Sequence, residues 1–133
     1  MKRWTDRLDR GAAVVKPAPR TVGDVVEGQA MLVPTARQVD DFIRSIPPGM
    51  KMDVRALRIA LAAEHGAEVS CPVYTGYHLR TVAEAAHEAL QWGMPLSEIT
   101  PFWRVLDYAT PTTRRLSFGD GLLKAQRARE GLD

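Results

Sequence analysis

The side chains best suited to covalent chemistry are Cys71 and His78, which lie close together in the sequence. A thiol beside an imidazole is the arrangement of a cysteine nucleophile, because the thiolate is the reactive form. No Asn or Asp stands at a spacing that completes a triad, so an inert thiol is the favoured interpretation. Glu84 and Glu88 lie one helical turn apart, which suits a solvated face better than a two-carboxylate active site. An enzyme that depends on Cys71 is therefore the weakest of the three functional hypotheses for this chain; the other two, DNA binding and protein binding, are given below.

A second group of side chains could bind an anion. Tyr77, Arg80, Thr81 and Glu84 project from one face of an expected helix, near its N-terminal end. Free backbone N–H groups at a helix N-terminus favour a phosphate, and a guanidinium adds a planar charged donor. Taken alone, Arg80 is an ordinary surface arginine. This helix face is nevertheless where we expect a ligand.

Length and composition limit the fold. The chain has 133 residues, 45% of them hydrophobic, which is enough for one compact domain with its own core. The net charge of +2 does not indicate a particular class of binding partner. No apolar run is long enough to span a membrane and no secretion signal begins the chain, so we expect a cytoplasmic protein without a membrane partner. A single cysteine and scattered histidines form no ligand motif, so we expect no metal or other cofactor.

The N-terminal segment differs in composition from the rest of the chain. Residues 1–30 contain clustered basic side chains and two prolines, which predict a basic, largely irregular arm. Residues 31–133 are expected to form the folded domain. The arm could follow a phosphate backbone, or it could be a solvated tail.

Capping residues and apolar periodicity predict four helices in that domain. The first begins at Thr35 and ends before Pro47, the second runs from Asp53 to Gly66, the third from Thr75 or Gly76 to Trp92, and the last from Asp120 through Glu130. In the last helix Leu122 and Leu123 are expected to face inward, and Lys124, Arg127 and Arg129 to face solvent.

A hairpin is expected between the last two helices. Residues 102–108 and 114–118 are rich in β-branched and aromatic side chains, and a turn-forming stretch separates them. Such a hairpin could form a wing. The expected fold class is mainly α with a small β-hairpin, a winged-helix-like DNA-binding domain.

Several segments occur in an order that is found in one family. They are residues 46–49, 53–64, 78–86, 100–105 and 118–123. In this order they resemble the C-terminal domain of methylated-DNA protein cysteine methyltransferases, over roughly residues 31–131. Where that family carries Pro-Cys-His-Arg-Val, this chain has Pro101-Phe102-Trp103-Arg104-Val105. The chain is therefore identified as a member of the cysteine-less, alkyltransferase-like branch.

The resemblance implies binding without catalysis. In the family a cysteine attacks the alkyl carbon, a histidine relays the proton and a glutamate orients that histidine. The resemblance places these roles on Phe102, Trp103 and, most nearly, Leu123, which cannot perform them, so we expect no enzyme activity. Arg80 matches the family's intercalating arginine, which fills the gap left by a rotated nucleotide. The tyrosine that helps to rotate the nucleotide falls near Val54, a departure that affects base flipping rather than duplex binding.

Other candidate contacts have two interpretations each. Arg114 and Arg115, on the expected wing, either grip phosphate or protect a strand edge. Arg104 either holds its loop or touches nucleic acid. Phe102 and Trp103 either line a pocket on which an extruded base stacks or begin a core strand.

The leading hypothesis is a non-catalytic protein that binds double-stranded DNA and senses alkylated or distorted bases without repairing them, with a repair or regulatory protein as a further partner. The expected DNA-binding residues are Tyr77, Arg80, Thr81, Arg104, Arg114 and Arg115. The alternative is a protein–protein interaction module that has lost DNA binding and uses exposed aromatic side chains such as Trp4, Trp92 or Tyr77. A continuous positive stripe favours DNA, and a neutral apolar patch favours a protein.

Overall fold

The structure is a computed structural model that describes residues 3–132, and it is mainly helical with one small sheet. The helices are α1 (Ala36–Arg44), α2 (Val54–Glu64), α3 (Pro72–Gln91), α4 (Pro111–Arg114) and α5 (Gly121–Glu130). The strands are β1 (Val14–Pro17), β2 (Ala30–Val33) and β3 (Val69–Ser70), and three short 3-10 helices are η1 (Thr5–Arg7), η2 (Leu96–Glu98) and η3 (Phe102–Arg104). The prediction of a mainly α fold with a small β component is confirmed.

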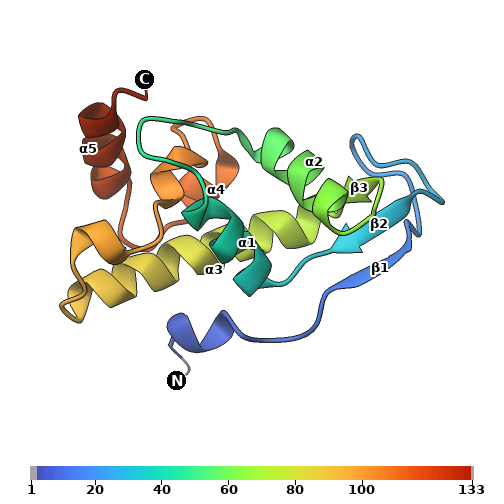
Figure 1. The fold of residues 1–133 in the computed structure, drawn as a ribbon, viewed down its shortest axis with the longest axis horizontal. Helices are drawn as coiled ribbons and strands as arrows, with labels where there is room; N and C mark the ends of the chain where they lie inside the picture. Colours follow the sequence, from blue (N-terminus) through green and yellow to red (C-terminus); the bar gives the residue numbers. More distant parts are fainter. Residues whose placement is uncertain (1–2, 133) are drawn as a thin grey trace.

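Helix α3 is the centre of the molecule. Figure 1 shows it running across the middle, with α1 lying against it, α5 at one end and the sheet at the other. The core is formed where α1, α2 and α3 meet, and its fully buried side chains include Val39, Ile43, Leu57, Leu61, Leu79 and Val82. Burial of such an apolar face is the main source of stability for helices of this length.

The predicted caps position α1 and α2. Thr35 and Gln38 form the expected capping box in front of α1. The Asp53 carboxylate accepts a hydrogen bond of 2.8 Å from the backbone N–H of Ala56 at the start of α2. Asp120 precedes α5 as expected, but its side chain makes no capping hydrogen bond. Local sequence therefore predicts these three helix starts, and the cap interaction at two of them.

Helix α3 begins one turn earlier than the sequence predicts. Pro72 is its first residue, because proline has no backbone N–H to lose in the first turn and its fixed φ suits a helix. The stretch 67–74 is therefore not a simple linker, since it contains β3 and the first turn of α3. As a consequence Tyr77 and Arg80 lie in the second and third turns, not at the helix end.

The predicted hairpin and wing are wrong. Within residues 3–132, the stretch 102–118 contains η3 and α4 and no strand. Its apolar residues serve the core instead, since Phe102, Val105 and Leu106 are buried. Asp107 then folds the chain back, because its carboxylate accepts hydrogen bonds from the backbone N–H groups of Ala109 and Thr110, both at 2.9 Å. The winged-helix arrangement is therefore not what the structure contains.

The strands come from the N-terminal half of the chain. Strand β1 pairs antiparallel with β2, and β2 pairs parallel with β3, in the order β1-β2-β3. Ala18, Val25, Met31 and Cys71 form a small second core beside the sheet. The segment before Met31 was expected to be largely irregular, but within its described part β1 and η1 are regular and contact the domain.

The segment η1 is attached to α3. The backbone N–H groups of Trp4 and Thr5 both donate to the carboxylate of Glu88, at 3.2 Å each. Leu8 is buried in the main core. Residues 3–8 therefore lie along α3 as part of the folded body.

Candidate functional site

A concave surface that involves several of the predicted residues lies beside the first half of α3. This cleft has a volume of about 750 Å³ and is formed by the N-terminus of α2, the first three turns of α3 and the loop that leads into α4. We call it the α3 cleft. Its lining residues include Asp53, Val54, Arg55, Tyr77, Arg80, Asp107, Thr110 and Arg115.

Three of the predicted DNA-binding residues meet in the α3 cleft. Tyr77 is 60% exposed, Arg115 is exposed, and 41% of the Arg80 side chain is exposed. Arg114 is also exposed, but it does not line the cleft. Both arginines lie at the end of α4 and not on a wing, so their position depends on a helix that the sequence analysis did not predict.

Thr81 does not belong to this surface. It is 2% exposed, and its hydroxyl donates to the carbonyl oxygen of Tyr77 at 3.3 Å. A buried hydroxyl that bonds to its own helix cannot contact DNA. The prediction that Thr81 projects outward is wrong, because α3 turns this position toward the core.

The Arg80 side chain is partly engaged in contacts within the protein. Its Nε atom lies 3.6 Å from a carboxylate oxygen of Glu84, which is 2% exposed. Its guanidinium carbon lies 5.3 Å from the centroid of the Trp4 ring. Nε makes no hydrogen bond within residues 3–132. Part of the charge of Arg80 is therefore balanced internally, while the exposed part of the side chain still faces the cleft.

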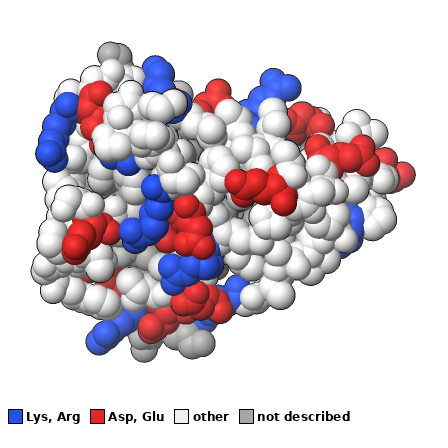
Figure 2. Space-filling model, viewed as in Figure 1, with Lys and Arg blue, Asp and Glu red and all other residues white. Residues whose placement is uncertain are grey.

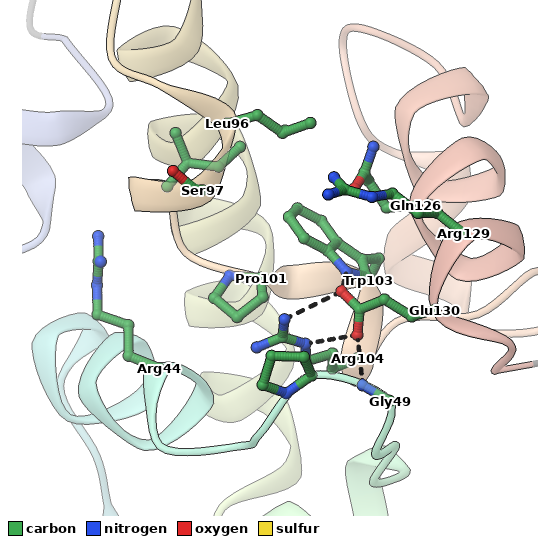
Figure 3. Close-up of a pocket in the computed structure, with 12 residues that line it drawn as sticks. Arg44, Gly49, Leu96, Ser97, Pro101, Trp103, Arg104, Gln126, Arg129 and Glu130 are labelled. Carbon is green, nitrogen blue, oxygen red and sulfur yellow. Dashed lines mark hydrogen bonds and ion pairs between the residues drawn. The ribbon is translucent and has the colours of Figure 1, made fainter.

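Arg104 is a structural residue. Its Nε and Nη2 atoms donate to the two carboxylate oxygens of Glu130, at 2.8 and 3.0 Å, and Nη1 donates to the carbonyl oxygen of Ile46 at 2.8 Å. Only 12% of the Arg104 side chain and 11% of the Glu130 side chain are exposed. The DNA-contact interpretation of Arg104 is therefore wrong, and the alternative that it holds its loop is supported by these contacts (Figure 3).

Glu130 is the centre of this network. The backbone N–H of Gly49 donates to it at 2.9 Å and the indole Nε1–H of Trp103 at 2.7 Å. Burial acts to raise the pKa of Glu130, but the hydrogen bonds from Arg104, Gly49 and Trp103 outweigh it and lower the pKa to about 2. Glu130 is therefore charged at neutral pH.

Phe102 and Trp103 do not form an open stacking surface. Phe102 is fully buried, and Trp103 is 4% exposed, with its ring edge-on to Phe102 at a centroid distance of 5.3 Å. The base-pocket interpretation of this pair is wrong. The alternative that they belong to the core is correct, although they lie in a 3-10 helix and not in a strand.

The carboxylate that contacts Trp103 was not among the residues predicted from the sequence. The resemblance put the family's orienting glutamate most nearly at Leu123, which is fully buried. In the structure Glu130 accepts the hydrogen bond from Trp103. One sequence signal pointed to Glu130, because an acid in the last turn of a helix opposes the helix dipole unless it has a cationic partner.

Arg127, in α5, also differs from the prediction. It is 4% exposed, although its position was expected to face solvent. Its Nη1 atom donates to the carbonyl oxygens of Trp103, at 2.7 Å, and Leu106, at 3.2 Å. Arg127 therefore fixes the backbone that follows η3.

Cys71 and His78 show no catalytic arrangement. Cys71 is 9% exposed and belongs to the small second core. His78 lies between the rings of Tyr74 and Tyr77, and burial lowers the pKa of His78 below its usual value. In the part of the chain that the structure describes, no group of three or more His, Cys, Asp or Glu side chains could hold a metal ion.

Charges of both signs are mixed on the face drawn in Figure 2. Lys and Arg side chains lie beside Asp and Glu side chains there, and no large area of one charge covers this face. This face therefore offers no broad positive surface to a polyanion.

Among residues 3–132 we find no helix with the length and apolar character that a membrane crossing needs.

Comparison with known proteins gives no relative. No protein-family model, no curated protein and no solved structure matches the chain. The class that the fold and the cleft define is a small, mainly helical protein with an arginine-lined cleft, and the family resemblance stays a prediction.

Proposed function

We propose that this protein binds double-stranded DNA without catalysis, through the α3 cleft. The observation that carries the proposal is the meeting of Tyr77, Arg80 and Arg115 in one open cleft, although α3 and α4 are separate in the sequence. Arg55, at the start of α2, adds a third guanidinium. An aromatic side chain among arginines suits a sugar-phosphate backbone with an adjacent base.

The electrostatics of the cleft support an anionic partner. Its two carboxylates, Asp53 and Asp107, accept hydrogen bonds from nearby backbone N–H groups at the start of α2 and in the loop before α4. The side chain of Arg55 is 75% exposed and lies 3.9 Å from Asp24, a distance at which an exposed pair contributes little. The side chain of Arg115 makes no hydrogen bond or ion pair with any residue from 3 to 132. Its charge is available to a phosphate.

The test is a fluorescence anisotropy titration of a labelled duplex at low salt. We expect saturable binding whose affinity falls steeply as the salt concentration rises. The reason is that protein binding releases cations condensed on the DNA, and this release is less favourable at high salt. A second duplex with one alkylated guanine tests lesion sensing, since tighter binding to it supports sensing and equal binding removes that part of the proposal. Absence of saturable binding at low salt would remove DNA binding altogether.

Arg115→Ala is expected to weaken duplex binding by about fivefold at low salt, since one phosphate contact is lost. It should also lower the slope of log affinity against log salt by about 1. The matched control is Arg129→Ala, which removes the same charge from an exposed site on α5, outside the cleft. Equal effects of the two variants would show that only net charge matters and would contradict a role for the cleft.

One observation favours the alternative of a protein-interaction module. The first turns of α3 expose Val73 by 67%, Tyr74 by 51% and Tyr77 by 60%. Exposed apolar side chains that lie together suit a protein contact. A chain that shows no saturable duplex binding at low salt would fit this alternative.

A further inference from the structure

A second pocket lies at the other end of the core, between α5 and the segment from η2 to η3. We call it the α5 pocket, and Figure 3 shows side chains from α1, α5 and the η2–η3 segment around it. Its volume is about 560 Å³, which is within the range of small-molecule sites in proteins. It shares no lining residue with the α3 cleft, so its ligand is independent of DNA binding.

A largely buried glutamine, Gln126, presents its side-chain amide to this pocket. Gln126 is 8% exposed and lines the pocket, and its side chain makes no hydrogen bond within residues 3–132. Figure 3 shows Gln126 on α5 among the residues that line the pocket. Its amide atoms are not among the buried unpaired atoms of the described residues, so they are reached by solvent in the pocket. An amide can both donate to and accept from a ligand. Gln126 is therefore available to bind a ligand.

The charges around the pocket are positive on balance. Arg129 is exposed on α5 and forms no ion pair with another described residue. Arg44 is 45% exposed, and its contacts with Asp40 and with the carbonyl oxygen of Glu98 use only part of its donors. The carboxylate of Glu130 already accepts hydrogen bonds from Trp103, Arg104 and Gly49.

We propose that the α5 pocket binds a small organic anion with an apolar body. Leu96, Ile99 and Pro101 supply apolar walls, on which a ring or a short hydrocarbon body would pack. Arg129, with the remaining donors of Arg44, meets the anionic group, and the Gln126 amide bonds a polar substituent. The carboxylate of Glu130 does not oppose the anion, because the guanidinium of Arg104 balances its charge.

The test uses phenyl phosphate as the probe and benzyl alcohol as an uncharged control of similar body. Two-dimensional NMR of the labelled protein follows the indole N–H of Trp103 and the side-chain amide of Gln126. We expect saturable shifts of both signals with phenyl phosphate and at least about tenfold weaker binding of benzyl alcohol, which lacks the charge. Absence of shifts at about 10 mM phenyl phosphate, or equal binding of the two probes, would overturn the proposal.

Two variants connect the binding to the pocket. Arg129→Ala, at an exposed position that folding does not need, is expected to weaken phenyl phosphate binding by about tenfold. Arg115→Ala, the same change in the α3 cleft, should leave it unchanged. Gln126→Leu keeps the volume of the side chain and should weaken binding without loss of the folded NMR spectrum. Equal effects of Arg129→Ala and Arg115→Ala would overturn the proposal.

Discussion

Glu130→Ala is expected to lower the free energy of unfolding by about 3 to 5 kcal/mol, the largest single effect that the structure predicts. The change removes a carboxylate from a buried ion pair and leaves the Arg104 guanidinium without its partner at 12% exposure. It also removes the acceptor for Trp103 and for the backbone N–H of Gly49. Each buried donor without an acceptor costs further free energy. Urea unfolding followed by circular dichroism measures the loss.

The matched control for this prediction is Glu64→Ala. Glu64 lies in the last turn of α2, as Glu130 lies in the last turn of α5, but its side chain is exposed. We expect a change within about 0.5 kcal/mol for this control. A loss of unfolding free energy below about 1 kcal/mol for Glu130→Ala, or similar losses for both variants, would show that the Arg104–Glu130 pair does not hold η3 against α5.

The second large effect is a dependence of stability on acid. The pKa of Glu130 is lowered from 4.5 to about 2 in the folded protein, because hydrogen bonds from Arg104, Gly49 and Trp103 outweigh the effect of burial. A lowered folded-state pKa stabilises the folded protein at all pH values above the unfolded pKa. This contribution, about 3 kcal/mol, is expected to be lost as pH falls from about 4.5 to about 2.

A comparison with Glu130→Gln isolates this titration. Glutamine cannot ionise, so the difference in unfolding free energy between the native protein and the variant should be largest near pH 7 and should shrink toward pH 2.5. Other carboxylates with lowered pKa values, such as Asp24 and Glu88, titrate in both proteins and cancel in the difference. A difference that stays constant over this pH range would contradict the assignment to Glu130.

The sequence predicted those parts of the fold that depend on neighbours in the chain. The capping box of Thr35 and the Asp53 cap were found because a cap needs only residues within one helical turn. The start of α3 was placed too late, because Pro72 was taken as part of a linker although proline fits the first turn of a helix. Existence and type of the long helices were therefore predictable, and one boundary was not.

The errors occurred where distant contacts decide the structure. Phe102 and Val105 have the composition of a strand, but the core buries them in and after a 3-10 helix, and Asp107 turns the chain immediately afterwards. Arg127 looked like a solvent-facing residue because the carbonyl groups that bind it come from η3 and the residues after it. No local pattern contains that information.

The candidate site was predictable in part for the same reason. Tyr77 and Arg80 were found because helical spacing places them on one face, and both line the α3 cleft. Arg115 was chosen for an expected wing and joins the cleft through α4 instead. Gln126 was not considered, because its place in the lining of a pocket becomes visible only in three dimensions.

The contact of η1 with α3 couples the start of the chain to the proposed DNA surface. Trp4 holds the guanidinium of Arg80 on one side and, through its backbone N–H, the carboxylate of Glu88 on the other. A duplex that draws Arg80 away from the indole would therefore also loosen the attachment of residues 3–8. If the proposed DNA binding is correct, residues 3–8 compete with the duplex for Arg80, and substitutions in this segment are expected to change the affinity for DNA.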